Sequence, residues 1–88
     1  MQLTFDNKTA LITGSDRNTG YIIASELANS GATVVLHSNQ CDGSAAAAAE
    51  TLQCRHAVEG DLATEAGCEA VLAQLDSQGL QIDILVNN

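Results

Sequence analysis

Apolar positions along this chain follow two different spacings. Short apolar runs lie at residues 9–13, 33–37, 56–58 and 82–86, and runs of this length are typical of buried strands. Between them, apolar residues recur every three to four positions, which is the spacing of one face of a helix. The pattern therefore predicts four strands alternating with three helices.

The ends of the predicted helices carry residues that favour starting or stopping a helix. The first helix, residues 19–30, ends before Gly31, and the third follows Thr64 and ends before Gly79. The second is expected to be capped by Asp42 or Ser44 and to run to about residue 53. The apolar faces are formed by Ile23, Ala24, Leu27 and Ala28 in the first helix and by Cys68, Val71, Leu72 and Leu75 in the third.

Strands that alternate with helices in this way favour right-handed crossovers and a parallel sheet. The predicted fold is α/β, a Rossmann-type doubly wound sheet in βαβαβαβ order with strand order 3-2-1-4. The first strand is then central in the sheet. Its carboxyl end, at Thr13 and Gly14, is the expected ligand crevice.

Composition narrows the functional classes. The 88 residues suffice for one small domain, and the formal net charge of -8 disfavours nucleic acid and anionic membranes as partners. The 3 cysteines are irregularly spaced, so we expect free thiols and no zinc site or other metal site. Residues 1–8 show no signal-peptide pattern, and no apolar run could span a membrane, so we expect a cytoplasmic protein.

The loop at residues 13–20 (TGSDRNTG) carries the clearest candidate chemistry. It follows a predicted strand and opens a predicted helix, where Gly14 would permit a tight turn and Gly20 a close approach of the helix to the strand. The helix N-terminus would offer free N–H groups to a pyrophosphate. A tight strand-to-helix turn without a ligand remains the alternative at this point.

Three motifs together resemble the short-chain dehydrogenase/reductase family. They are residues 13–20 after the first strand, Asp61-Leu62 after the third, and IDILVNN at residues 82–88. Within the family, the chain is most similar to members of the 3-oxoacyl-carrier-protein reductase type. The resemblance implies that residues 1–88 form the N-terminal dinucleotide-binding part of a single Rossmann domain, truncated at the start of the family's NNAG segment.

The resemblance also implies a cofactor-binding role for thirteen residues. Seven of them lie in the loop and at the start of the helix, around the pyrophosphate and adenosine: Gly14, Ser15, Asp16, Arg17, Asn18, Thr19 and Gly20. Ser38 and Asn39 would lie beside the adenosine ribose, Asp61 would accept a hydrogen bond from the adenine amino group beside the Leu62 backbone, and Asn87 and Asn88 would touch the cofactor ribose.

Two loop residues depart from the family pattern. Asn18 replaces the middle glycine, and asparagine is among the residues that best tolerate a positive φ. Asp16 stands where many NADP-dependent members carry a small hydroxyl residue, and its carboxylate would repel a 2′-phosphate. NADP(H) is nevertheless favoured over NAD(H), because Ser38 and Asn39 replace the acid typical of NAD-binding members and Arg17 supplies a cation.

The resemblance implies that the full-length protein transfers a hydride between the nicotinamide cofactor and a small-molecule carbonyl or alcohol substrate, and that it is a homo-oligomer. The family's catalytic Ser, Tyr and Lys would lie further along, so we expect no catalytic residue among these 88 and no activity from this chain alone. Tyr21 is interpreted as a packing residue, since Ser25 rather than lysine lies four residues on. His37 is interpreted as a polar strand-end residue and His56 as a surface or strand-edge residue.

Two further interpretations remain open. The same half-fold could serve as a non-catalytic nucleotide-binding module, or as a purely structural α/β domain that binds no adenine dinucleotide. An Ala-Gly after Asn88 and a YxxxK further on would indicate the enzyme.

Overall fold

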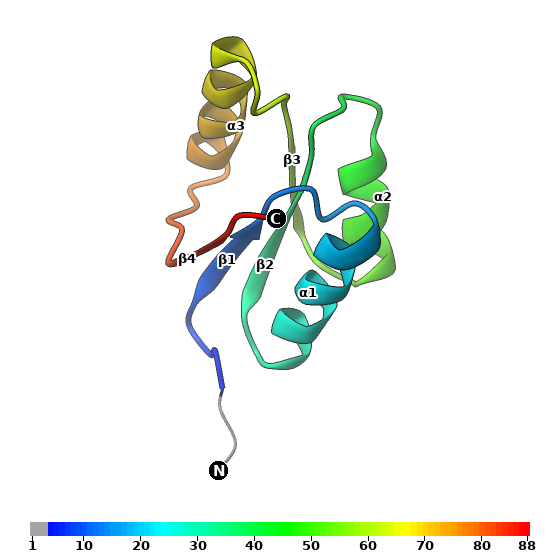
Figure 1. The fold of residues 1–88 in the computed structure, drawn as a ribbon. Helices are drawn as coiled ribbons and strands as arrows, with labels where there is room; N and C mark the ends of the chain where they lie inside the picture. The colour runs from blue at the N-terminus through cyan, green and yellow to red at the C-terminus, as the bar shows by residue number, and fades with distance from the viewer. Residues whose placement is uncertain (1–3) are drawn as a thin grey trace.

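A computed structural model of the chain describes residues 4–88 as four strands and three helices in strict alternation (Figure 1). The elements are β1 (Thr9–Ile12), α1 (Asn18–Asn29), β2 (Thr33–Ser38), α2 (Ser44–Thr51), β3 (His56–Glu59), α3 (Glu65–Ser77) and β4 (Ile84–Val86). Residues 1–3 lie outside the described residues, and they belong to the segment in which we expect no signal peptide. The predicted element order is confirmed.

The strands form one parallel sheet in the order β3-β2-β1-β4, as predicted. Helices α1 and α2 cover one face of the sheet and α3 covers the other (Figure 1). Crossovers from β1 through β2 to β3 therefore use one face, and the crossover from β3 to β4 uses the opposite face. The strand order reverses between β1 and β4, and ligands of doubly wound sheets bind at such a point.

The core is divided between the two faces of the sheet because successive side chains of a strand point to opposite sides. Ala10, Ile12, Val34 and Leu36 pack toward α1 and α2 together with Ala24, Ala45, Ala48 and Ala49. Leu11, Val35 and Val58 pack toward α3 against Val71 and Leu75. The small side chains of α2, and Ala24 in the middle of α1, permit close packing of these helices on the sheet. Tyr21 packs against the first cluster, in agreement with its interpretation as a packing residue.

Most predicted helix ends are confirmed. Gly31 and Gly79 follow α1 and α3 with φ of 97° and 67°, and the Thr64 side chain accepts a hydrogen bond from the Gly67 N–H at 2.9 Å. The predicted cap of α2 is wrong: the helix begins at Ser44, and Gly43 occupies the N-cap position with φ 84°. Asp42 instead accepts a hydrogen bond from the Ser44 N–H at 3.0 Å, from outside the helix.

A few predicted bounds and one predicted core residue also differ. Helix α2 ends at Thr51 because Gln53 adopts a φ of 60°, which no right-handed helix contains. Strand β4 begins at Ile84, since Asp83 uses its carboxylate to accept a hydrogen bond from the Thr9 N–H at 2.9 Å. Leu72 was expected on the buried face of α3 but is 65% exposed, because the helix packs through Val71 and Leu75.

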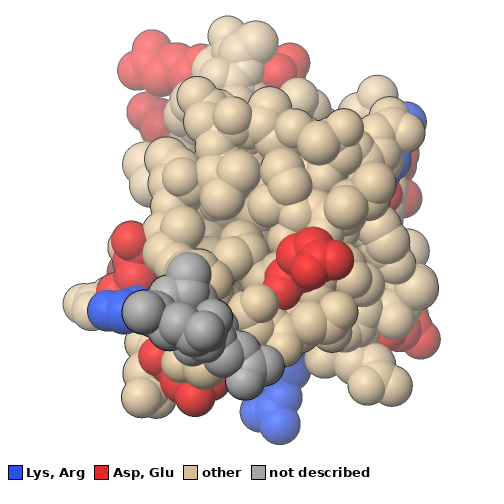
Figure 2. Space-filling view, turned by 60° about the horizontal axis from the view of Figure 1, so that its bottom comes forward, with Lys and Arg blue, Asp and Glu red and all other residues tan. Residues whose placement is uncertain are grey.

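Charged side chains are scattered over the surface. On the face that Figure 2 presents, acidic residues lie in separate places and the few basic residues are isolated from one another. This face therefore offers no continuous basic surface for a polyanion. Among residues 4–88, no helix is long and apolar enough to cross a membrane.

Candidate functional site

The predicted site residues gather where the strands end. A hollow of about 270 Å³ is lined by Gly14, Asp16, Arg17, Ser38, Asn39 and Gln40, which follow β1 or lie at the end of β2. Five of these six were predicted from the sequence, and Gln40 was not. The hollow lies at the carboxyl ends of the central strands, which is where a doubly wound sheet binds its ligand.

The glycine loop has the backbone geometry that the sequence predicts. Gly14 has a φ of 60° and Asn18 a φ of 57°, so the left-handed conformation at the family's middle glycine is kept by asparagine. A Cβ atom on Gly20 would clash with the Gly14 carbonyl oxygen and lie 2.7 Å from Asn88 Nδ2. Gly20 therefore permits the close approach between α1 and the end of β1.

The N-terminus of α1 lacks a side-chain cap. Arg17 occupies the N-cap position with an extended backbone and makes no side-chain capping bond, and the first turn holds no acidic residue. The N-terminus of α3, in contrast, is capped by Thr64. The first backbone hydrogen bond of α1 runs from the Tyr21 N–H to the Arg17 carbonyl. The N–H groups that precede Tyr21 in the helix are thus open to an anion, at the positive end of the helix dipole.

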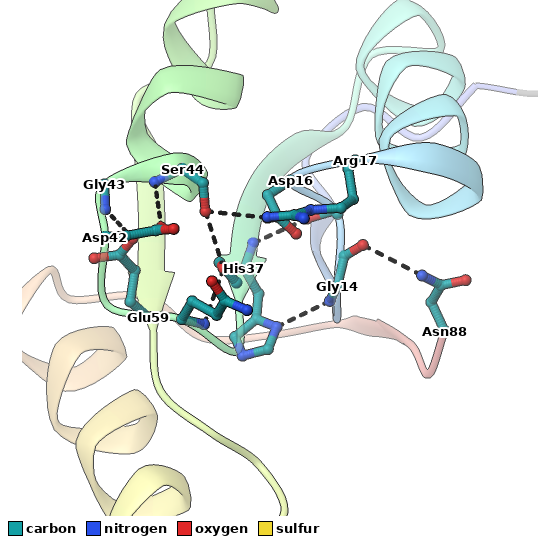
Figure 3. A network of polar contacts seen from close by, with 12 residues as sticks. Gly14, Asp16, Arg17, His37, Asp42, Gly43, Ser44, Glu59 and Asn88 are labelled. Atoms are coloured by element: carbon teal, nitrogen blue, oxygen red, sulfur yellow. Dashed lines mark hydrogen bonds and ion pairs between the residues drawn. The ribbon is translucent and has the colours of Figure 1, made fainter.

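Asp16 and Arg17 form a pair beside this N-terminus (Figure 3). The Asp16 side chain is 6% exposed, and its Oδ2 accepts hydrogen bonds at 3.0 Å from Arg17 and from the Ser44 hydroxyl. Burial opposes ionisation of Asp16, but the bonds from Arg17 and Ser44 outweigh it, so its pKa lies below the ordinary value. Arg17 remains 57% exposed and can reach a ligand.

Ser38 belongs to the same polar network. It is 1% exposed, and its hydroxyl accepts a hydrogen bond at 3.0 Å from the Gln40 N–H. Its Oγ lies 3.0 Å from Ser44 Oγ, to which it donates because the single Ser44 hydroxyl hydrogen is bonded to Asp16. Ser44 thus connects the end of β2 to Asp16, although 28 residues separate it from Asp16 in the sequence. No spacing in the sequence indicates this link.

The segment that carries the adenine-binding candidates Asp61 and Leu62 is hydrogen-bonded to Asn39, which follows β2. Asn39 Oδ1 accepts a hydrogen bond from the Leu62 N–H at 3.3 Å, and Asp61 Oδ1 accepts one from the Ala63 N–H at 2.9 Å. Asp61 itself is exposed. The segment after β3 is therefore held beside the end of β2, with the Asp61 carboxylate accessible from solvent.

The segment after β4 lies against the glycine loop. The Asn88 N–H donates to Thr13 Oγ1 at 2.9 Å. Asn88 Nδ2 donates to the Gly14 carbonyl at 3.3 Å, as Figure 3 shows. These bonds hold the end of β1 next to the end of β4. Asn87 is exposed.

Ser15 and His37 face each other inside the protein. Ser15 is 0% exposed, and its hydroxyl accepts the His37 N–H at 2.9 Å, so its side chain points into β2 and away from the hollow. His37 is also fully buried, and both of its ring nitrogens have hydrogen-bond partners. The sequence did not predict that His37 is a buried residue bonded to three loop residues. The one feature of the sequence that could have indicated it is a histidine inside an apolar strand.

Other candidate chemistry is sparse. Among residues 4–88, no group of three or more His, Cys, Asp or Glu side chains could hold a metal ion. Cys41, Cys54 and Cys68 are free, as expected, and burial raises the pKa of the Cys54 thiol. His56 lies on the edge strand β3, where its ring contacts the Gln78 side chain at 2.8 Å.

Comparisons with known proteins agree on one family. The family model described as short chain dehydrogenase matches residues 8–88. A sorbitol dehydrogenase of Cereibacter sphaeroides is 36% identical over 98% of this chain and 34% of its own length. The 3-oxoacyl-acyl-carrier-protein reductase FabG of Aquifex aeolicus is 33% identical over 100% of this chain and 37% of its own length.

Solved structures give the same result. A Pseudomonas aeruginosa RhlG/NADP active-site complex superposes with a TM-score of 0.89 at 31% identity, over 99% of this chain and 36% of that chain. The present chain spans about a third of the length of the curated relatives it matches.

Proposed function

The chain belongs to the short-chain dehydrogenase family, and from this premise we propose that residues 1–88 are the N-terminal dinucleotide-binding part of a longer Rossmann domain in an oxidoreductase. The observation that carries the proposal is the uncapped N-terminus of α1 at the point where the strand order reverses. Open N–H groups and a positive helix end at this point are suited to a pyrophosphate.

The residues around the hollow fit a dinucleotide. Gly14 and Gly20 bring no side chain to the loop, and Asn18 keeps the left-handed turn with a φ of 57°. The first N–H groups of α1, near Thr19, would hold the pyrophosphate. Asp61 and the Leu62 backbone would contact the adenine, and Ser38 and Asn39 would lie at the adenosine ribose. Asn87 and Asn88 would contact the other ribose. Ser15 would support the loop through its hydrogen bond with His37 of β2.

We favour NADP(H) over NAD(H) as the cofactor. The end of β2 carries Ser38 and Asn39 in place of an acid, and the exposed Arg17 guanidinium can pair with a 2′-phosphate. Asp16 opposes this preference less than its position suggests, because Arg17 and Ser44 both bond to its carboxylate. The similar RhlG structure is a complex with NADP, which supports the same preference.

In the complete protein, the bound cofactor supplies hydride transfer to a carbonyl or from an alcohol. The 88 residues bind and orient it, and the catalytic residues lie outside them. We also propose a small-molecule carbonyl or alcohol substrate, a homo-oligomer, and a cytoplasmic location, for which three free thiols are suited to a reducing compartment.

Replacing Arg17 tests the cofactor site. Arg17→Ala should weaken NADP(H) binding by about 1–3 kcal/mol, the scale of a charge-assisted hydrogen bond, and leave NAD(H) nearly unchanged. Arg55→Ala is the matched control, because it removes the same charge from an exposed position outside the hollow. Fluorescence titration of the complete gene product with NADPH and NADH measures both affinities.

The outcomes separate the possible functions. Equal losses for the two cofactors in Arg17→Ala would exclude Arg17 as the residue that selects the phosphate. Binding of NADPH without turnover of any ketone or alcohol by the complete protein would indicate a non-catalytic nucleotide-binding module. A complete protein that binds neither dinucleotide would be a structural domain, and the proposed function would be wrong.

A further inference from the structure

His37 makes four hydrogen bonds to residues far from it in the sequence. Its N–H donates to Ser15 Oγ and its carbonyl accepts from the Ser15 N–H, both at 2.9 Å. Its Nδ1 accepts a hydrogen bond from the Gly14 N–H at 2.9 Å, and its Nε2 lies 2.9 Å from the Gly60 carbonyl oxygen (Figure 3 shows the Gly14 bond). All four polar groups of this buried residue are therefore bonded.

The two ring partners determine the state of the imidazole. The Gly14 N–H can only donate, so Nδ1 must be unprotonated, and the Gly60 carbonyl can only accept, so Nε2 must carry the proton. The ring is thus neutral, in the Nε2–H tautomer.

The two partners belong to the two segments that we propose hold the pyrophosphate and the adenine of the dinucleotide. Gly14 opens the loop at the N-terminus of α1, and Gly60 immediately precedes Asp61. These segments are far apart in the sequence and follow β1 and β3, which do not pair with each other in the sheet. The imidazole, on the strand between them, links the two directly.

We propose that His37 is a positioning residue for the dinucleotide, and that its neutral ring sets the placement of the phosphate loop relative to the adenine-binding segment. The identity of the ligand rests on the proposed function. His37 is buried beneath the site and touches the ligand nowhere. It acts through the Gly14 amide and the Gly60 carbonyl.

The two links are not equivalent. A buried N–H without a partner is rarer in folded proteins than a carbonyl that lacks one of its bonds, because a carbonyl oxygen has two lone pairs. Loss of the Gly14 link should therefore disturb the site more than loss of the Gly60 link. The Gly14 link also lies in the loop that has the positive φ at both Gly14 and Asn18.

Nitrogen-15 NMR of the complete gene product tests the ring state directly. We expect the His37 ring to give the signature of a neutral Nε2–H tautomer, with a scalar coupling across the hydrogen bond between the Gly14 amide and Nδ1. A proton on Nδ1, or a charged ring at neutral pH, would overturn the proposal without any substitution.

Two substitutions separate the links. In His37→Asn the amide oxygen takes the place of Nδ1 and can accept the Gly14 N–H, whereas in His37→Gln the amide takes the place of Nε2 and can reach only Gly60. We expect the Asn variant to bind NADPH within about threefold of wild type, and the Gln and His37→Leu variants to bind it about tenfold or more weakly, the scale set by a donor left unsatisfied at a part-buried position. His56→Asn is the matched control and should leave binding unchanged.

Equal losses in the Asn and Gln variants, or wild-type affinity in His37→Leu, would overturn the positioning role. A purely structural role would lower the melting temperature of all three variants with no such order in NADPH affinity. Failure of the wild-type protein to bind NADPH would instead overturn the proposed function and, with it, the ligand of this inference.

Discussion

Replacing Gly20 by alanine sets the helix propensity of α1 against its packing on β1. In an exposed helix this change stabilises by about 1 kcal/mol, because alanine loses less backbone entropy than glycine. In this protein the new Cβ would clash with the Gly14 carbonyl oxygen and lie 2.9 Å from the Gly14 carbonyl carbon. Propensity and packing therefore predict changes of opposite sign.

The packing cost should exceed the propensity gain. Extra atoms in a well-packed site cost about 1–3 kcal/mol, and a clash with backbone belongs at the upper end because no rotamer change relieves it. Subtracting about 1 kcal/mol for propensity leaves a net loss of about 2 kcal/mol. For a domain of this size, that loss lowers the melting temperature by about 8–16 °C.

The assay is thermal unfolding of the chain followed by far-ultraviolet circular dichroism at fixed protein concentration. Ser25→Ala is the matched control, because it changes another α1 residue to alanine and should stabilise by about 0.5 kcal/mol through propensity alone. In the complete protein, Gly20→Ala should also weaken NADPH binding, since relief of the clash moves the Gly14 loop.

A Gly20→Ala protein as stable as the Ser25→Ala protein would refute the reasoning. It would mean that α1 does not approach the end of β1 as closely as the structure shows. If Gly20→Ala lost stability as expected but kept its NADPH affinity, the packing argument would hold. The inference that the position of the Gly14 loop controls NADPH binding would then be wrong.

Two other predictions concern the loop and the edge of the sheet. Asn18→Gly should be neutral or slightly stabilising, whereas Asn18→Val should cost about 1–2 kcal/mol, because a β-branched residue resists the φ of 57°. Thermal melts in which valine is tolerated as well as glycine would contradict this. Within residues 4–88, β4 pairs only with β1 and Leu85 is 63% exposed, so the 88-residue chain should self-associate through this edge. The chain should also show no NADPH turnover with ketones, because we propose that the catalytic residues lie outside it. Leu85→Lys should shift it toward monomer in sedimentation, and a wild-type monomer at all concentrations would remove the edge-strand argument.

Local features of this protein could be predicted from the sequence because they depend on neighbouring residues. The spacing of apolar residues predicted all seven elements, and Gly31, Thr64 and Gly79 predicted helix ends, since each acts on its own turn of backbone. The left-handed conformation of Asn18 was predicted from the tolerance of asparagine for positive φ. The alternation of strands and helices predicted a parallel sheet, and the doubly wound fold to which it belongs predicted the strand order.

Contacts between distant segments were decided only by the tertiary structure. The partners of His37 at Gly14 and Gly60 depend on β2 lying between β1 and β3 in one particular register. The Asp16–Ser44 bond depends on where α2 begins, and the exposure of Leu72 depends on how α3 is rotated on the sheet. None of these is visible in periodicity, because a hydrogen bond between distant residues is set by the placement of whole elements and not by local spacing.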